Sequence, residues 1–142
     1  MKRTGSAIWN GGLKDGKGTI STESRALDGL PYSFARRFGD EKGTNPEELI
    51  GAAHAACYSM ALSMVLGQNG MEPEEIATRA EVSIEQVEGG FAINRIHLHT
   101  RARIPGADPA AFNRCAEEAK AGCPVSKVLA GAEITLDAAL EG

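Results

Sequence analysis

The chain has 142 residues, of which 42% are hydrophobic and 24% are charged, and this ordinary composition excludes an extended disordered protein. The length suits a single compact domain with a buried core, so we predict one domain over residues 1–142. The net charge is −4 at pH 7 and the lysines and arginines are scattered, which argues against a nucleic-acid partner.

The N-terminal part of the sequence predicts a β-hairpin. Residues 6–10 alternate weakly and residues 18–22 are rich in β-branched side chains, with a glycine-rich run at residues 11–16 between them. The run leads into Lys17, as in a phosphate-binding loop, but Gly18 stands where that motif needs Ser or Thr. Nucleotide binding is therefore not expected.

The first six residues carry two positive charges but no apolar stretch follows them. A secretory signal needs such a stretch, so we predict a cytoplasmic protein.

An aromatic-rich segment at residues 31–38 is too short and irregular to assign as a strand or a helix. It contains two adjacent arginines, Arg36 and Arg37, which by themselves are typical of solvated surface charges. An arginine stays charged and offers several donors, so either residue is also a candidate to hold a thiolate.

A long helix is predicted from Pro46 to about Gln68. Asn45 is a suitable N-cap, Pro46 fits the first helical position, and Glu47 and Glu48 complement the helix dipole in the first turn. The apolar residues cover nearly every face of this helix, which indicates burial all round and, for so small a chain, a dimer.

Residues 49–66 lack formal charge and have the length of a membrane span. They are mostly Ala, Gly, Ser and Met, with His54 in the middle, and such residues gain little from lipid. A buried helix of a soluble protein is the favoured interpretation, and no membrane partner is expected.

The second half of the sequence predicts an antiparallel strand pair and a third strand. Residues 80–84 and 96–104 alternate between apolar and polar side chains, with a turn at Gly89 and Gly90, and residues 133–140 alternate again. Helices are predicted to begin after Asp108 and at Cys123-Pro124. The expected fold class is α+β.

The three cysteines, Cys57, Cys115 and Cys123, include no closely spaced pair, so a secreted disulfide framework is not expected. Cys115 lies on the apolar stripe of its helix and is expected to be a packing residue. Cys57 is compatible with packing or reactivity. Cys123 precedes a helix, where backbone N–H groups lower a thiol pKa, so by local evidence it is the more reactive thiol.

Other combinations of these residues would support different chemistry. His54 and Cys57 share a helix face and could form the nucleophile pair of a hydrolase. A metal site from His54, Cys57 and Cys123 lacks a fourth ligand. Histidines 97 and 99 point outward from their strand, where simple exposure is expected. Glu47 is ten residues before Cys57, about 15 Å along the helix, and cannot reach its sulfur through that helix.

Three segments together resemble the OsmC family of osmotically inducible peroxidases. They are Gly43-Thr44-Asn45-Pro46-Glu47-Glu48-Leu49, Ala53-His54-Ala55-Ala56-Cys57 and Ala121-Gly122-Cys123-Pro124-Val125-Ser126. The resemblance covers essentially the whole chain. It implies an α+β, OsmC-like fold in which antiparallel sheets wrap around long central helices, in an intertwined homodimer with active sites at the subunit interface.

The resemblance also implies residue roles. The peroxidatic cysteine of the family corresponds to Cys57 and the resolving cysteine to Cys123, an order that overrules the local evidence. The family arginine falls on Arg37, since Tyr32-Ser33-Phe34 precedes it and Phe38 follows it, and the family glutamate falls on Glu47. Hydroperoxide resistance proteins, the sister branch, place this arginine elsewhere in the chain. The match at Arg37 therefore implies that the sequence belongs to the OsmC branch.

The implied function is a thiol-dependent peroxidase that reduces organic hydroperoxides to alcohols in oxidative and osmotic stress defence. Cys57 becomes a sulfenic acid, a Cys57–Cys123 disulfide follows, and a dithiol of the lipoyl type is the expected reductant. No metal, flavin or other cofactor is expected. The alternative is a redox-sensing or stress-induced binding protein that does not turn over repeatedly.

Overall fold

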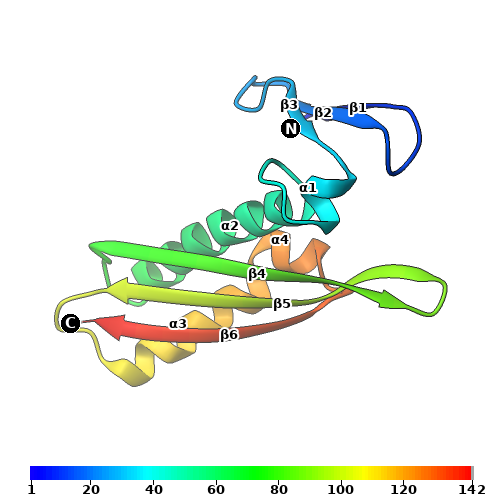
Figure 1. The fold of residues 1–142 in the computed structure, drawn as a ribbon. Helices are drawn as coiled ribbons and strands as arrows, with labels where there is room; N and C mark the ends of the chain where they lie inside the picture. The colour runs from blue at the N-terminus through cyan, green and yellow to red at the C-terminus, as the bar shows by residue number, and fades with distance from the viewer. Residues whose placement is uncertain (142) are drawn as a thin grey trace. The chain divides into compact units, whose positions relative to one another are not determined.

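A computed structural model describes residues 1–141 of the chain (Figure 1). The secondary structure is α+β, as the sequence predicts, with two separate three-stranded sheets and four helices in the described residues. The chain divides after Leu49 into two compact units, each with its own sheet. The assignment of all 142 residues to one domain stays a prediction.

The first unit is built on an antiparallel sheet in the order β1-β2-β3. Strands β1 (Gly5–Asn10) and β2 (Lys17–Thr22) form the predicted hairpin, and β3 (Leu30–Tyr32) pairs with β2. A side chain at Gly18 would lie within 3 Å of the Trp9 and Tyr32 rings. Glycine at this position therefore lets the two aromatic rings approach each other, with centroids 5.3 Å apart.

The unassigned aromatic segment forms the end of β3 and the short helix α1 (Phe34–Phe38). The Ser33 hydroxyl caps this helix by accepting a hydrogen bond of 3.3 Å from the Arg36 backbone N–H. Five residues are too few to show helical periodicity, so the sequence pattern could not predict this helix.

The predicted long helix is confirmed as α2 (Pro46–Gln68). Its N-cap is Asn45, whose Oδ1 accepts a hydrogen bond of 2.8 Å from the backbone N–H of Glu48. The helix begins in the first unit and continues into the second.

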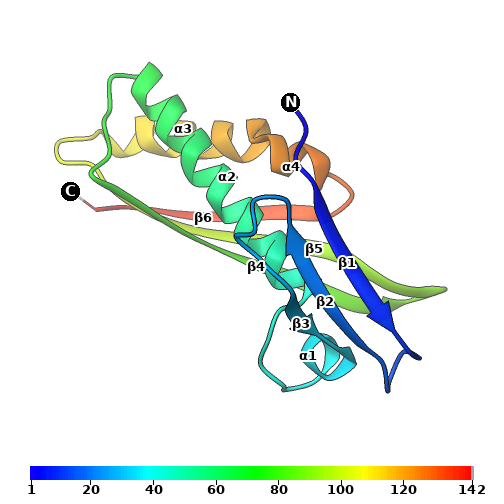
Figure 2. The same cartoon turned by 90° about the horizontal axis from the view of Figure 1, so that it is seen from above.

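The second unit contains a sheet in the order β4-β5-β6 (Figure 2). Strands β4 (Glu75–Val87) and β5 (Gly90–Arg103) are the predicted antiparallel pair. β6 (Glu133–Glu141) lies parallel to β5, because helices α3 (Pro109–Gly122) and α4 (Pro124–Val128) carry the chain back to the starting end of β5. This sheet is therefore mixed, not purely antiparallel as expected from the family resemblance.

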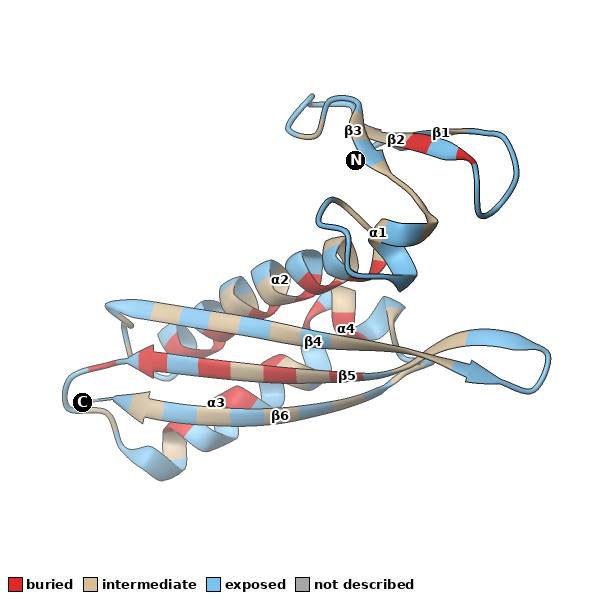
Figure 3. Ribbon diagram, viewed as in Figure 1, coloured by how far each residue is buried: buried red, intermediate tan, exposed pale blue. Residues whose placement is uncertain are grey.

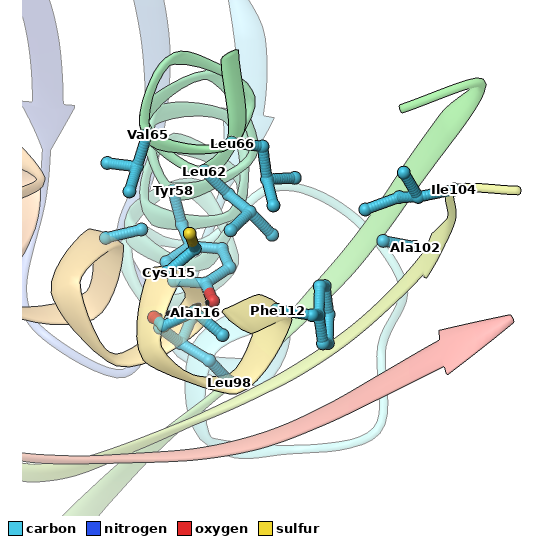
Figure 4. Close-up of a cluster of buried hydrophobic side chains, with 11 residues drawn as sticks. Tyr58, Leu62, Val65, Leu66, Leu98, Ala102, Ile104, Phe112, Cys115 and Ala116 are labelled. Carbon is cyan, nitrogen blue, oxygen red and sulfur yellow. Dashed lines mark hydrogen bonds between the residues drawn. The ribbon is translucent and has the colours of Figure 1, made fainter. Parts of the chain in front are cut away.

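One hydrophobic cluster holds α2, α3 and the sheet of the second unit together (Figure 4). Leu98 and Ala102 of β5 contribute from the sheet, while Leu62 comes from α2 and Phe112 from α3. Cys115 lies in this cluster at 3% exposure, as predicted for a packing residue. The Tyr58 hydroxyl donates to the Ala116 carbonyl at 3.1 Å, so this buried polar group is satisfied.

Within a single chain, α2 is buried on one face only (Figure 3), so burial on every face stays a prediction that depends on the expected dimer. Tyr58 and Leu62 on one face are fully buried, but Met60 and Met64 on another face are 77% and 60% exposed. The sheet and α3 cover only one side of the helix. α2 is long and apolar enough to cross a membrane by length and composition alone, a test that the core helix of a soluble protein also passes.

Candidate functional site

Two of the three cysteines meet in the second unit. The Sγ atoms of Cys57 and Cys123 lie 2.9 Å apart, although 66 residues separate them in the sequence. Cys57 lies mid-way along α2, and Cys123 is fully buried at the junction where α3 ends and α4 begins. The separation is longer than the S–S bond of about 2.05 Å in a disulfide, so the two thiols are free but adjacent.

The second unit by itself favours the thiolate at Cys123. Burial raises the pKa of Cys57, and its hydrogen bond to Cys123 raises it further. Burial also opposes ionisation of Cys123, but hydrogen bonds with Cys57, Ser126 and Val125 outweigh it and lower the Cys123 pKa. Ser126 and Val125 belong to the start of α4, as the position of Cys123 before Pro124 predicts, whereas Cys57 belongs to α2. A cation beside the Cys57 sulfur would favour its thiolate.

Ser126 connects the cysteine pair to a buried histidine. Its hydroxyl and backbone both hydrogen-bond the Cys123 sulfur, and its Oγ lies 2.7 Å from Nε2 of His54. His54 is fully buried, which lowers its pKa and favours the neutral ring. Because His54 contacts Ser126, the structure lends no support to a His54–Cys57 nucleophile pair. No role was predicted for Ser126 from the sequence, and neither was its contact with His54.

An apolar groove of about 590 Å³ opens beside the Cys57 sulfur. Its walls come from α2, α3 and the first residue of α4, and they include Met60, Met64 and Val65. Such a lining accommodates an apolar molecule next to the thiol.

The first unit brings together Arg37 and Glu47. Arg37 Nε donates to Glu47 Oε1 at 2.9 Å, and the guanidinium also lies 5.1 Å from the centre of the Phe38 ring. The Glu47 side chain is 9% exposed and the Arg37 side chain 36%, so the pair is partly withdrawn from water. The second oxygen of Glu47 is buried and has no hydrogen-bond partner among the described residues.

Arg36 has different partners. Its Nε donates to the Lys42 carbonyl at 3.2 Å and its guanidinium pairs with Glu41 at 3.1 Å. The two adjacent arginines are therefore structurally distinct. The contact between Glu47 and Arg37 also adds to the helix-dipole role that the sequence alone suggested for Glu47.

A small pocket of about 260 Å³ lies beside Arg37 within the first unit. Trp9, Tyr32, Phe34 and Phe38 supply most of its walls. An aromatic pocket with one guanidinium at its edge suits a ligand that has an apolar body and a polar or anionic end.

The four candidate residues therefore form two pairs, one in each compact unit. A family model described as OsmC-like protein matches residues 39–138 of the chain. The chain belongs to the OsmC family. This family model includes Glu47, Cys57 and Cys123, while Arg37 lies two residues before its start.

Relatives of known name support the same assignment. The OsmC-family chain is 56% identical over 137 residues to the peroxiredoxin OsmC of Escherichia coli strain K12, covering 96% of this chain and 95% of that protein. It is 33% identical over 119 residues to an organic hydroperoxide resistance protein of Xanthomonas axonopodis pv. citri, covering 81% and 80% of the two chains.

A solved structure shares the fold. The organic hydroperoxide resistance protein OhrB of Bacillus subtilis superposes with a TM-score of 0.68 at 26% identity, covering 97% of this chain and 98% of that one. The OsmC-like α+β fold expected from the sequence motifs is thereby confirmed.

Proposed function

We propose that this OsmC-family chain is a thiol-dependent peroxidase that reduces organic hydroperoxides to alcohols in stress defence. The observation that carries the proposal is the Cys57–Cys123 pair, with its sulfurs 2.9 Å apart beside an apolar groove. The names of the relatives, a peroxiredoxin and an organic hydroperoxide resistance protein, support the same activity. The test is repeated turnover of a hydroperoxide with a dithiol.

The proposed reaction has three steps. The Cys57 thiolate attacks the distal oxygen of the hydroperoxide, the O–O bond breaks, and the alkoxide leaves and takes a proton to become the alcohol. The resulting Cys57 sulfenic acid condenses with the Cys123 thiol, which forms the disulfide and releases water. A dithiol of the lipoyl type then reduces this disulfide through a mixed disulfide and is itself oxidised.

Arg37 is the proposed source of a cation that favours the Cys57 thiolate. Within the second unit, burial and the neighbouring Cys123 both raise the Cys57 pKa. A guanidinium near the sulfur favours the thiolate, and arginine keeps its charge at all relevant pH values. The proposal therefore assigns Arg37 to the thiolate and Glu47 to the orientation of Arg37.

Replacement of Glu47 by alanine is expected to lower kcat/KM for cumene hydroperoxide by roughly 10-fold to 100-fold, the value of a hydrogen bond to a charged group. The buried carboxylate of Glu47 holds Arg37 Nε at 2.9 Å, and its loss frees the guanidinium. Glu48→Ala is the matched control, because Glu48 lies in the same helical turn but contacts Asn45. Unchanged turnover and an unchanged Cys57 pKa in Glu47→Ala would refute the orienting role.

The apolar groove beside Cys57 predicts a preference for organic hydroperoxides. We expect kcat/KM for cumene hydroperoxide to exceed that for hydrogen peroxide by more than roughly 10-fold, since each buried methylene is worth about 0.8 kcal/mol. Comparable rates for the two peroxides in the wild type would contradict the prediction.

A homodimer is proposed as the active form. The exposed face of α2 carries Met60 and Met64, and a second copy of the helix would remove them from water. Sedimentation equilibrium is expected to give twice the chain mass of 14.9 kDa. A mass equal to one chain at micromolar concentration would rule out the dimer.

A cytoplasmic location, where dithiol reductants are present, belongs to the same proposal.

A further inference from the structure

Two histidines lie side by side on the face of the second sheet that is turned away from the hydrophobic cluster. His97 and His99 alternate with the buried residues Ile96, Leu98 and Thr100 along β5. Their ring centroids are 4.3 Å apart and the rings are nearly perpendicular. Both side chains are about one-third exposed, so a small ion in solution can reach them.

The strand register adds a carboxylate to this pair. Asp137 of β6 lies directly opposite His99, and its Oδ2 is 3.0 Å from Nε2 of His97 and 3.9 Å from Nδ1 of His99. The three potential ligand atoms all lie within 4.8 Å of one another. Ligand atoms bound to one tetrahedral ion at about 2.0–2.2 Å are separated by roughly 3.4 Å. Small side-chain rotations therefore suffice to place all three around one ion.

The other nitrogen of each ring already has a partner. His99 Nε2 lies 2.9 Å from Oε1 of Glu81, and His97 Nδ1 lies at hydrogen-bond distance from the Thr135 hydroxyl. Metal-binding histidines in proteins usually have their second nitrogen fixed in this way by a carboxylate, hydroxyl or carbonyl.

We propose that His97, His99 and Asp137 form a binding site for a divalent transition-metal ion such as Zn²⁺. Imidazole and carboxylate ligands suit Zn²⁺, Ni²⁺ or Cu²⁺ rather than Mg²⁺ or Ca²⁺, which prefer oxygen ligands alone. Exposure of Asp137 leaves room for water as a fourth ligand. The ion would cross-link β5 and β6, and it takes no part in the proposed peroxidase reaction.

The test is isothermal titration of Zn²⁺ into the full chain carrying Cys57→Ser and Cys123→Ser, which removes the sulfur pair as a competing ligand. We expect one ion per chain. His97→Ala and His99→Ala should each weaken Zn²⁺ binding by more than roughly 100-fold. Glu81→Gln should weaken it by roughly 10-fold to 100-fold, because Glu81 orients the His99 ring without binding the ion. Glu133→Gln is the matched control, because Glu133 is an exposed acid on the same face of β6, and it should leave binding unchanged.

Co²⁺ absorption of the wild-type chain gives a second measurement that needs no cysteine variant. Imidazole and carboxylate ligands predict visible d–d bands without a sulfur-to-cobalt charge-transfer band, and these bands should vanish in His99→Ala. Saturable binding that persists in both histidine variants would overturn the site. So would the absence of saturable Zn²⁺ binding, or Co²⁺ bands that show sulfur ligation alone.

Discussion

Cys57→Ser is expected to abolish the consumption of cumene hydroperoxide in the presence of excess dihydrolipoamide. A serine hydroxyl is not ionised at neutral pH and forms no sulfenic acid, so neither the attack nor the later disulfide can occur. The loss should be complete in both single-turnover and steady-state measurements.

Cys123→Ser should behave differently from Cys57→Ser. Without a partner 2.9 Å away, the Cys57 sulfenic acid has no thiol to condense with. The variant is expected to reduce about one equivalent of peroxide and then stall or oxidise further to the sulfinic acid. Mass spectrometry of the stalled protein distinguishes these two oxidation states.

Cys115→Ala is the control for both variants, because Cys115 is buried in the hydrophobic cluster and should leave turnover intact. Loss of peroxide attack in Cys123→Ser, with attack retained in Cys57→Ser, would reverse the assigned roles. A wild type that is oxidised only once per molecule would instead indicate a redox sensor or stress-induced binding protein.

Local signals explain why most of the fold was predictable. The Asn45 cap and the following acids mark the start of α2, and the alternation through β4 and β5 marks their pairing. The fixed position of Cys123 before Pro124 likewise predicts its low pKa. Each of these features depends on residues that are close together in the sequence or follow a short period.

Contacts between distant segments could not be read in this way. The parallel placement of β6 depends on how α3 and α4 pack, and it is this register that brings Asp137 opposite His99. The hydrogen bond between Ser126 and His54 also joins residues 72 positions apart. The Cys57–Cys123 pairing was expected only through family resemblance, because no local pattern connects two residues that are 66 positions apart.

Arg37→Ala is expected to lower kcat/KM for cumene hydroperoxide by roughly 100-fold, comparable with the loss of one preorganised charge-stabilising donor in other active sites. The sign of the pH effect follows from the charge. Burial already raises the Cys57 pKa. In the proposed mechanism the Arg37 guanidinium opposes this shift, so its loss raises the Cys57 pKa further and leaves less thiolate at neutral pH. Part of the lost rate should return as the pH is raised.

Arg36→Ala provides a matched control for the Arg37 variant, since Arg36 is the adjacent residue of α1 and its guanidinium pairs with Glu41. The pH dependence of the second-order rate constant should shift to higher pH in Arg37→Ala and stay unchanged in Arg36→Ala. Arg37→Lys keeps the charge but loses the planar fork that Glu47 holds, so an intermediate rate is expected. Equal losses in Arg36→Ala and Arg37→Ala would show that α1 acts through its structure and not through a cation at the thiolate.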